Sequence, residues 1–162
     1  PNKVPKVLLD TTGGGSVRFN PNLYNCGKVC LSLLGTWNGN AGESWNKETS
    51  TFLQVMISIQ SLILVDQPYF NEPGYERDIN NERGKSANFN YNDNIRFNNI
   101  KWAILDNIKY PQEEFKDVIK NHFKIKKNDI KSLCNNWLSE TKLDKNKYKL
   151  LIDETFNLLD NY

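Results

Sequence analysis

The stretch NPNLYNCGKVC, from Asn20 to Cys30, places two cysteines four residues apart behind an Asn-Pro-Asn triplet and a glycine. They are two of the chain's three cysteines, and the third is Cys134. A thiol does chemistry only when a base, a metal ion or an already activated substrate is brought to it. The rest of the sequence therefore decides which of these cysteines, if either, is reactive.

The composition predicts a soluble single domain with free thiols. At 162 residues the chain can bury roughly two-thirds of the surface of its unfolded form, so neither a disulfide nor a metal is required for stability. The sequence has no signal-peptide pattern and no apolar run near the ~18 residues that a membrane span needs. These features predict a protein of a reducing compartment, the cytoplasm, with no membrane partner.

The charge distribution gives little support for a nucleic-acid partner. Lys and Arg number 21 against 19 Asp and Glu, and the basic surplus lies in residues 101–150, which carry twelve basic and seven acidic residues. Lysines on the solvent side of amphipathic helices explain such a surplus without any ligand. We therefore expect no nucleic acid among the partners.

Two short runs before the cysteines are typical of β-strands. Apolar residues alternate at Val7 and Leu9, and again at Val17 and Phe19, and Gly13-Gly14-Gly15 joins the two runs. A phosphate-binding loop needs a Gly-Lys-Ser/Thr ending followed by a helix, and both are missing here. The sequence therefore predicts an antiparallel strand pair with a glycine turn.

The region after the cysteines predicts a buried helix and then a mobile loop. Thr51 and Gln54 fit a capping box, and the apolar run that follows them stops before Pro68. Residues 77–94 are polar, rich in asparagine and poor in aliphatic side chains. Such a segment buries too little surface to order itself firmly, so we expect a loop there.

Helical patterns fill the C-terminal half. They cover Ile95–Asn107, Pro111–Phe123, Asp129–Leu138 and Lys145–Leu159. The second pattern has Pro111 in its first turn and an apolar face that includes Phe115 and Val118. Together with the strands, these patterns predict an α+β fold with a small antiparallel sheet in the N-terminal part and helices in the C-terminal half.

Two kinds of cysteine chemistry are disfavoured. A zinc site needs four thiolate or imidazole ligands, and the chain offers only its three cysteines and the single His122, with Cys134 in an apolar stripe. A cysteine protease needs an imidazole base, and His122 lies on a lysine-rich helix that no pattern ties to the cysteine loop. Exchange of an acyl group between thiols needs neither, because its substrate arrives as a thioester.

The quoted stretch resembles the signature of the ubiquitin-conjugating enzyme family. That signature is His-Pro-Asn, then a glycine, then the catalytic cysteine eight residues after the asparagine. Here Asn22 is followed by Gly27 and, eight residues on, by Cys30, while Cys26 falls at a variable position. Asn20 stands where most members have histidine. The subgroup of giant inhibitor-of-apoptosis hybrids also has Asn-Pro-Asn, and the sequence resembles the conjugating domain of that subgroup most.

The resemblance covers roughly residues 1–138 and carries expectations about domains. It implies a ubiquitin-conjugating (UBC) core over 1–138 that contains the mobile loop 77–94, followed by a helical extension over 139–162. Members of the family begin with a helix and two strands that precede the stretch matching Pro1 onward. The resemblance therefore implies that this sequence lacks them.

The resemblance also implies a mechanism. Cys30 would accept ubiquitin as a thioester from the ubiquitin-activating enzyme, in an ATP-dependent pathway, and transfer it to a substrate lysine without a cofactor. Asn22 would stabilise the oxyanion, and Glu72 would help to deprotonate the incoming ammonium. Each also has a plain interpretation, Asn22 as a turn asparagine and Glu72 as an exposed loop glutamate.

Two further expectations come from the residues near the nucleophile and from rival functions. Trp37 and Trp45 are expected to be packing anchors. The implied partners are ubiquitin, its activating enzyme and a ubiquitin ligase. Two alternatives stay open: a catalytically silent module that binds ubiquitin or a ligase, and a helical adaptor that uses the basic residues 101–150.

Overall fold

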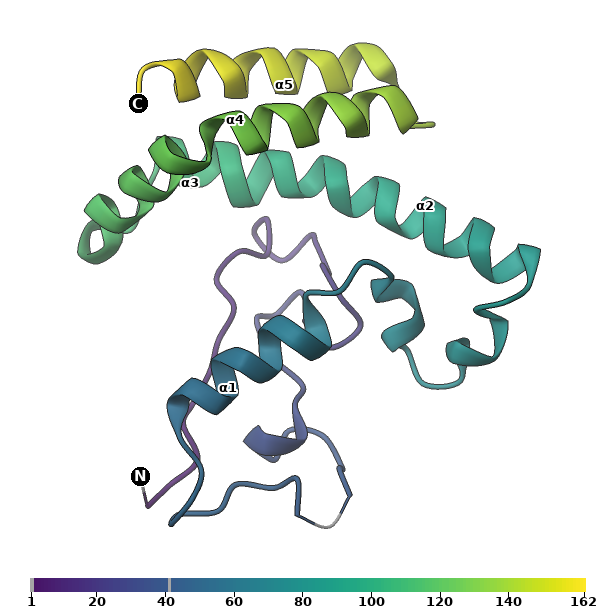
Figure 1. Cartoon of the computed structure of the whole chain (residues 1–162), viewed down its shortest axis with the longest axis vertical. Coiled ribbons are helices and arrows are strands. Elements are labelled where there is room, and N and C mark those ends of the chain that lie inside the picture. The colour runs from purple at the N-terminus through teal and green to yellow at the C-terminus, as the bar shows by residue number, and fades with distance from the viewer. Residues whose placement is uncertain (1, 41) are drawn as a thin grey trace. The chain divides into compact units, whose positions relative to one another are not determined.

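The computed structural model describes residues 2–40 and 42–162 (Figure 1). Its residues form two compact units: the first ends at Asn92, the second begins at Asp93, and each has an apolar core of its own. The division falls within α2 (Glu82–Asn98). Among the described residues, no helix combines the length and the apolar character needed to cross a membrane.

The N-terminal unit consists of loops and short helices around one apolar core. Its longest helix before α2 is α1 (Phe52–Ser58), which continues as a π-helical segment, Ile59–Ile63. Shorter 3-10 turns cover Ser32–Leu34, Pro68–Asn71 and Tyr75–Asp78. The core residues come from the cysteine loop and from the α1 segment: Leu23, Val29, Leu31, Leu34, Val55 and Ile63.

The first of the two predicted strands, at Val7 to Leu9, pairs with a different segment in the structure. The described residues contain three isolated antiparallel bridges and no β-strand, so the predicted sheet stays a prediction. Leu8 pairs with Lys28, and the Leu9 N–H donates to the Gly27 carbonyl at 2.9 Å, whereas the sequence predicted pairing with residues 17–19. A Cβ on Gly27 would lie only 2.9 Å from the Leu9 carbonyl oxygen, so the close approach depends on glycine.

The predicted glycine turn is confirmed. Gly13, Gly14 and Gly15 all have positive φ angles, between 58° and 86°. The Val17 N–H closes the turn by donating to the Thr12 carbonyl at 2.9 Å. Three consecutive residues in this region of backbone space are tolerated because glycine has no Cβ.

The helix predicted after Thr51 forms, but only one of its faces is buried. The capping box is confirmed: the Gln54 N–H donates to the Thr51 hydroxyl oxygen at 3.3 Å, and the Thr51 N–H donates to the Gln54 side chain at 2.7 Å. Within the N-terminal unit Val55 is fully buried, whereas Leu53 is 66 % exposed. The prediction of a buried helix was therefore wrong for one face of α1.

Helix α2 corrects the loop predicted over residues 77–94. Its first turn is capped by the Asn81 side chain, which accepts from the Gly84 N–H at 2.7 Å, and Lys85 pairs with Glu82 one turn away at 2.9 Å. Composition was misleading because local capping and tertiary hydrogen bonds replace the missing apolar face. The Asn92 side chain, for example, donates to the Asp66 carbonyl at 2.9 Å.

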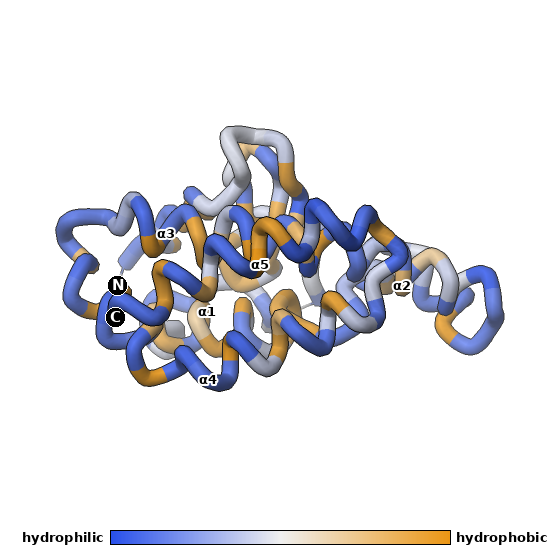
Figure 2. The backbone as a smooth tube through the Cα atoms, turned by 90° about the horizontal axis from the view of Figure 1, so that it is seen from above, coloured by the Kyte–Doolittle hydropathy of each residue, from blue (hydrophilic) through white to orange (hydrophobic). Residues whose placement is uncertain are grey.

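The C-terminal unit is helical throughout. From the end of α2 the chain continues as a π-helical segment, then α3, a 3-10 turn, α4 and α5. Their bounds are Asn99–Leu105, Asp106–Lys109, Glu113–Phe115, Lys116–Glu140 and Lys145–Asp160. Helices α4 and α5 lie side by side (Figure 1), and hydrophilic and hydrophobic positions alternate along both (Figure 2).

Two of the four predicted C-terminal helices are one. Residues 111–123 and 129–138 were predicted as separate helices, but α4 runs without a break from Lys116, because the residues between them include no glycine or proline. Pro111 precedes α4 instead of occupying its first turn. Phe115 and Val118, predicted to face inward, are 56 % and 66 % exposed in this unit. The last predicted helix is confirmed as α5.

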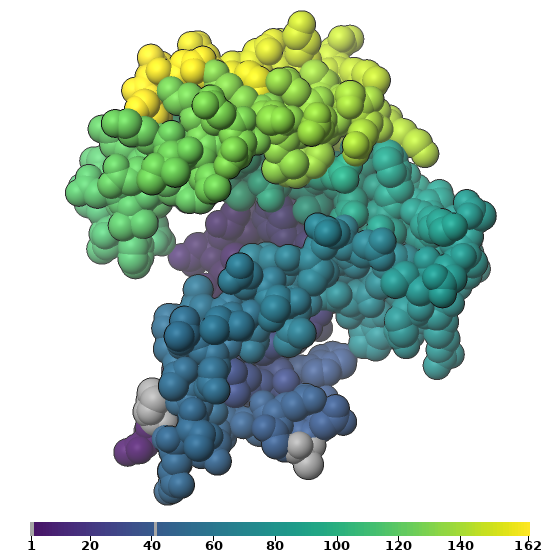
Figure 3. All heavy atoms as spheres, in the orientation of Figure 1, coloured from purple at the N-terminus to yellow at the C-terminus, as the bar shows by residue number. Residues whose placement is uncertain are grey.

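The core of the C-terminal unit joins the end of α2 to α4 and α5. The outer atoms of α4 and α5 lie against one another in the space-filling view (Figure 3). The buried Asp93 carboxylate accepts from the Thr141 hydroxyl at 2.6 Å and from the Lys142 N–H at 2.8 Å. Cys134 is fully buried in this core, and burial raises the pKa of its thiol to about 11. The predicted boundary between residues 138 and 139 lies near the end of α4 and stays a prediction.

Candidate active site

A short hairpin brings Asn22 opposite Cys30. The Tyr24 N–H donates to the Lys28 carbonyl at 2.9 Å, and the Gly27 N–H closes the turn on the Tyr24 carbonyl at 2.9 Å. The Cys30 N–H then donates to the Asn22 carbonyl at 2.8 Å. The spacing of eight residues noted in the sequence therefore corresponds to two residues paired across a hairpin.

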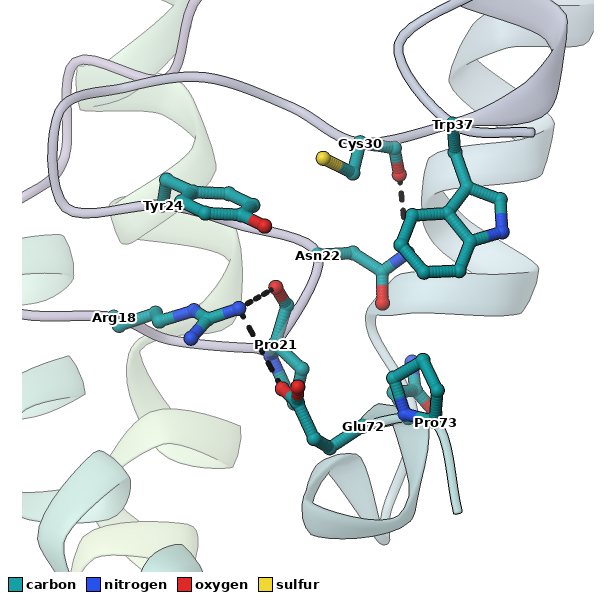
Figure 4. Close-up of a pocket in the computed structure, with 9 residues that line it drawn as sticks. Arg18, Pro21, Asn22, Tyr24, Cys30, Trp37, Glu72 and Pro73 are labelled. Carbon is teal, nitrogen blue, oxygen red and sulfur yellow. Dashed lines mark hydrogen bonds and ion pairs between the residues drawn. The ribbon is translucent and has the colours of Figure 1, made fainter. Parts of the chain in front are cut away.

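The side chain of Asn22 also contacts Cys30. Its amide nitrogen donates to the Cys30 carbonyl oxygen at 3.1 Å. Figure 4 shows this bond on one side of Cys30 and the sulfur on the other. The amide thus fixes the backbone that carries the thiol.

Asn20 is a structural residue of this loop. It is 1 % exposed, its side-chain oxygen accepts from the Asn22 N–H at 2.8 Å, and its amide donates to the Ile63 carbonyl at 2.8 Å. The side chain of Asn71 approaches the same oxygen at 3.4 Å. These bonds join the Asn-Pro-Asn turn to the α1 segment, so asparagine satisfies the position without an imidazole ring.

All three predicted site residues, Cys30, Asn22 and Glu72, line one cavity of about 130 Å³. Cys30 is only 3 % exposed, and it borders this cavity. The remaining lining residues are Arg18, Pro21, Tyr24, Trp37, Asn71 and Pro73. Glu72 reaches this cavity from the segment after the Pro68–Asn71 turn, far away in the sequence (Figure 4).

The residue that sequence reasoning missed is Arg18. Its guanidinium donates to the Pro21 carbonyl, lies 3.6 Å from the Glu72 carboxylate and stands 4.5 Å above the centre of the Tyr24 ring. Its backbone carbonyl accepts from the Tyr91 hydroxyl at 3.1 Å. Burial, opposed by the Arg18 charge, raises the pKa of Tyr91 to about 12. The one sign in the sequence that Arg18 has a special role is its position as a cation between the apolar residues Val17 and Phe19.

Of the other candidate residues, Trp37 alone lines the cavity. All three cysteines are free thiols; Cys26 is exposed at the hairpin tip, and Cys134 belongs to the C-terminal unit. His122 is exposed on α4, in that same unit, with its ring edge against Phe123. Trp45 packs against the core as predicted, but Trp37 is 48 % exposed and lines the cavity, so it is not a packing anchor.

Comparison with known protein families accounts for this arrangement. A family model described as ubiquitin-conjugating enzyme matches residues 1–98. The chain belongs to the ubiquitin-conjugating enzyme family. The match includes the hairpin and Glu72, so the cavity lies within the part of the chain that defines the family. Membership fits the predicted α+β class.

Individual members of the ubiquitin-conjugating enzyme family are similar over most of the chain. A probable ubiquitin-conjugating enzyme of Acanthamoeba polyphaga mimivirus is 54% identical over 162 residues, which are 99% of this chain and 11% of that protein. The human dual E2 ubiquitin-conjugating enzyme/E3 ubiquitin-protein ligase BIRC6 is 54% identical over 140 residues, 86% of this chain and 3% of that protein. A putative ubiquitin-conjugating enzyme of Arabidopsis thaliana is 47% identical over 135 residues, 83% of this chain and 40% of that protein. The chain thus spans less than half the length of each of these relatives.

Proposed function

We propose that this chain is the catalytic part of a ubiquitin-conjugating enzyme and that Cys30 is its nucleophile. The Cys30 thiolate attacks the thioester carbonyl of ubiquitin on the activating enzyme, forms a new thioester and releases the activating enzyme's thiol. A substrate lysine then attacks the new thioester, an isopeptide bond forms and the Cys30 thiolate leaves. The observation that carries the proposal is that Cys30, Asn22 and Glu72 share one cavity.

Asn22 is proposed to stabilise the charge that develops during the second step. When the lysine attacks, the carbonyl oxygen of the thioester becomes an oxyanion, which a neutral amide stabilises by donating a hydrogen bond. The Asn22 amide already donates to a carbonyl at Cys30, at 3.1 Å. The plain interpretation, an amide that only holds the turn, describes this ground-state bond and is compatible with the proposed role.

Glu72 is proposed to receive the incoming lysine. A lysine reaches the site as an ammonium ion and must lose a proton before it attacks, which a nearby carboxylate can promote. The Glu72 side chain is 38 % exposed at the cavity, so solvent and substrate both reach it. No described residue of the cavity other than Glu72 carries a negative charge.

The partners and setting follow from this reaction. We propose ubiquitin, the ATP-dependent ubiquitin-activating enzyme and a ubiquitin ligase as partners, and the cytoplasm, where free thiols persist, as the compartment. Residues 1–138 are proposed to form the UBC core, including a sheet, with 139–162 as an extension. The competing function is a silent module that binds ubiquitin or a ligase without forming a thioester.

A charging assay separates these functions. The full-length protein is incubated with activating enzyme, ATP and ubiquitin, and gels are run with and without reductant. We expect a reductant-sensitive adduct that Cys30→Ser replaces with a stable ester or abolishes. Cys26→Ser is the matched control and should charge normally, because its exposed thiol lies outside the cavity.

Two results would contradict the proposal. Loss of charging in Cys26→Ser together with normal charging in Cys30→Ser would show that the nucleophile is Cys26 and not Cys30. Absence of any adduct, with ubiquitin binding equal in wild type and both variants, would favour the silent module.

A further inference from the structure

Arg18 forms the link between the nucleophile's hairpin and the carboxylate on the opposite side of the cavity. Its guanidinium donates to the carbonyl of Pro21, which directly precedes the hairpin, and contacts the hairpin itself through the Tyr24 ring at 4.5 Å. Its third contact is the Glu72 carboxylate, at 3.6 Å (Figure 4). Arg18 is therefore fixed by the hairpin and offers its charge to Glu72.

Glu72 itself has few other constraints. It ends the Pro68–Asn71 turn with an extended backbone and is followed by Pro73 and by Gly74, whose φ is +92°. The Arg18 contact is the one ion pair or side-chain hydrogen bond found for its carboxylate within the described part of the chain. Without a fixed cation beside it, an exposed glutamate samples several rotamers.

We propose that Arg18 is a positioning residue that holds the Glu72 carboxylate at the mouth of the Cys30 cavity. The inference rests on the proposed function, because it assigns Arg18 to the aminolysis step alone. Arg18 acts by fixing where the ammonium of the substrate lysine is received and loses its proton. Thioester formation on Cys30 does not use Glu72 and so does not depend on Arg18.

The chain offers a matched control for the loss of this charge. Lys28 belongs to the same hairpin, and its ammonium lies 5.6 Å from the centre of the same Tyr24 ring. Lys28 does not line the cavity and makes no ion pair with Glu72 in the residues described. Lys28→Gln therefore removes a neighbouring cation but none of the three contacts that Arg18 makes.

The experiment compares discharge of the preformed Cys30 thioester to two acceptors. Lysine is protonated at neutral pH and needs deprotonation, whereas hydroxylamine is already uncharged. We expect the Arg18→Gln variant to form the thioester normally and to discharge it to lysine about ten-fold more slowly. This effect is smaller than the rate enhancement that general base catalysis supplies, because Glu72 is still present but less well positioned. Discharge to hydroxylamine should be unchanged, and Lys28→Gln should match wild type with both acceptors.

A double mutant tests whether Arg18 acts through Glu72. Glu72→Gln should slow discharge to lysine by about 10²-fold, and adding Arg18→Gln should slow it no further. Arg18→Lys, which keeps the charge but not the planar fork, should recover part of the rate.

Three results would overturn the inference. Equal slowing with lysine and hydroxylamine would show that Arg18 only maintains the loop. Multiplication of the two effects in the double mutant would show that Arg18 acts independently of Glu72. Normal lysine discharge in Arg18→Gln would refute the inference alone, whereas a wild type that never charges would refute the proposed function and the inference with it.

Discussion

At the scale of single residues, the site depends on two asparagines with different tasks. Asn20 is buried, and its side chain accepts a hydrogen bond from the Asn22 N–H and donates one to the Ile63 carbonyl. Asn22 is half-buried, lines the cavity and donates to the Cys30 carbonyl at 3.1 Å. Of these two asparagines, Asn22 alone lines the cavity with Cys30, so it is the one proposed to stabilise the oxyanion.

Replacement of Asn22 should separate the two chemical steps. We expect Asn22→Ala to form the Cys30 thioester but to discharge it to lysine about 10²-fold more slowly, because the oxyanion loses a donor. Single-turnover discharge of purified thioester measures this rate. Asn25→Ala is the control, since Asn25 donates to the Gly15 carbonyl from the same hairpin but away from the cavity. Equal slowing in both variants would indicate general damage to the hairpin.

At the scale of elements, α2 is the largest departure from what the sequence predicted. Its residues are polar, and it is held by an Asn81 cap and by side-chain bonds such as that from Tyr91 to the Arg18 carbonyl at 3.1 Å. A helix without a continuous apolar face depends on such contacts, because helix propensity alone rarely stabilises one in isolation.

A proline in the middle of α2 distinguishes a helix from a loop. Asn90 is an exposed residue near the centre of Glu82–Asn98. We expect Asn90→Pro to reduce the free energy of unfolding by about 3 kcal/mol, because proline removes a helical hydrogen bond and clashes with the preceding turn. Denaturant unfolding measures the change, and Asn90→Ala should cost nothing of that size. A neutral Asn90→Pro would restore the loop that the sequence predicted.

Local signals in the sequence predicted the elements that depend on neighbours along the chain. The Thr51 capping box, the triple-glycine turn and α5 are of this kind. The sequence did not predict that Leu8 and Leu9 pair with the hairpin, or that Arg18 contacts Glu72. Those contacts join residues distant in sequence, and no periodicity or cap encodes them.

At the scale of the whole molecule, the two units differ in what they contain. The proposed site residues all belong to the N-terminal unit, whereas the C-terminal unit contributes a helical core with ion pairs on its surface, including Arg96 to Glu140 at 2.8 Å. In that core Cys134 is fully buried, and burial raises the pKa of its thiol to about 11. Cys134 is therefore a neutral packing residue at physiological pH.

The stability of the C-terminal unit should fall in alkaline solution. Between pH 9 and 11 the Cys134 thiol ionises in the unfolded chain but keeps its proton in the folded one, so the unfolded state binds fewer protons and stability decreases as pH rises. We expect a loss of roughly 1–2 kcal/mol across this window, measured by denaturant unfolding followed by far-ultraviolet circular dichroism. The slope should be shallower in Cys134→Ala and unchanged in Cys26→Ala. An equal slope in all three proteins would mean that other groups control it.

The hairpin from Asn22 to Cys30 has a consequence for how such a site can be inherited. The proposed nucleophile Cys30 and its amide partner Asn22 lie in one short uninterrupted segment, so changes elsewhere in the chain leave their spacing intact. Their carboxylate partner Glu72 is encoded separately and can be exchanged without disturbing the hairpin. At the hairpin tip the exposed Cys26 position tolerates other side chains, whereas Gly27 does not and the length of the turn is fixed, because a single inserted residue would move Cys30 out of register with Asn22.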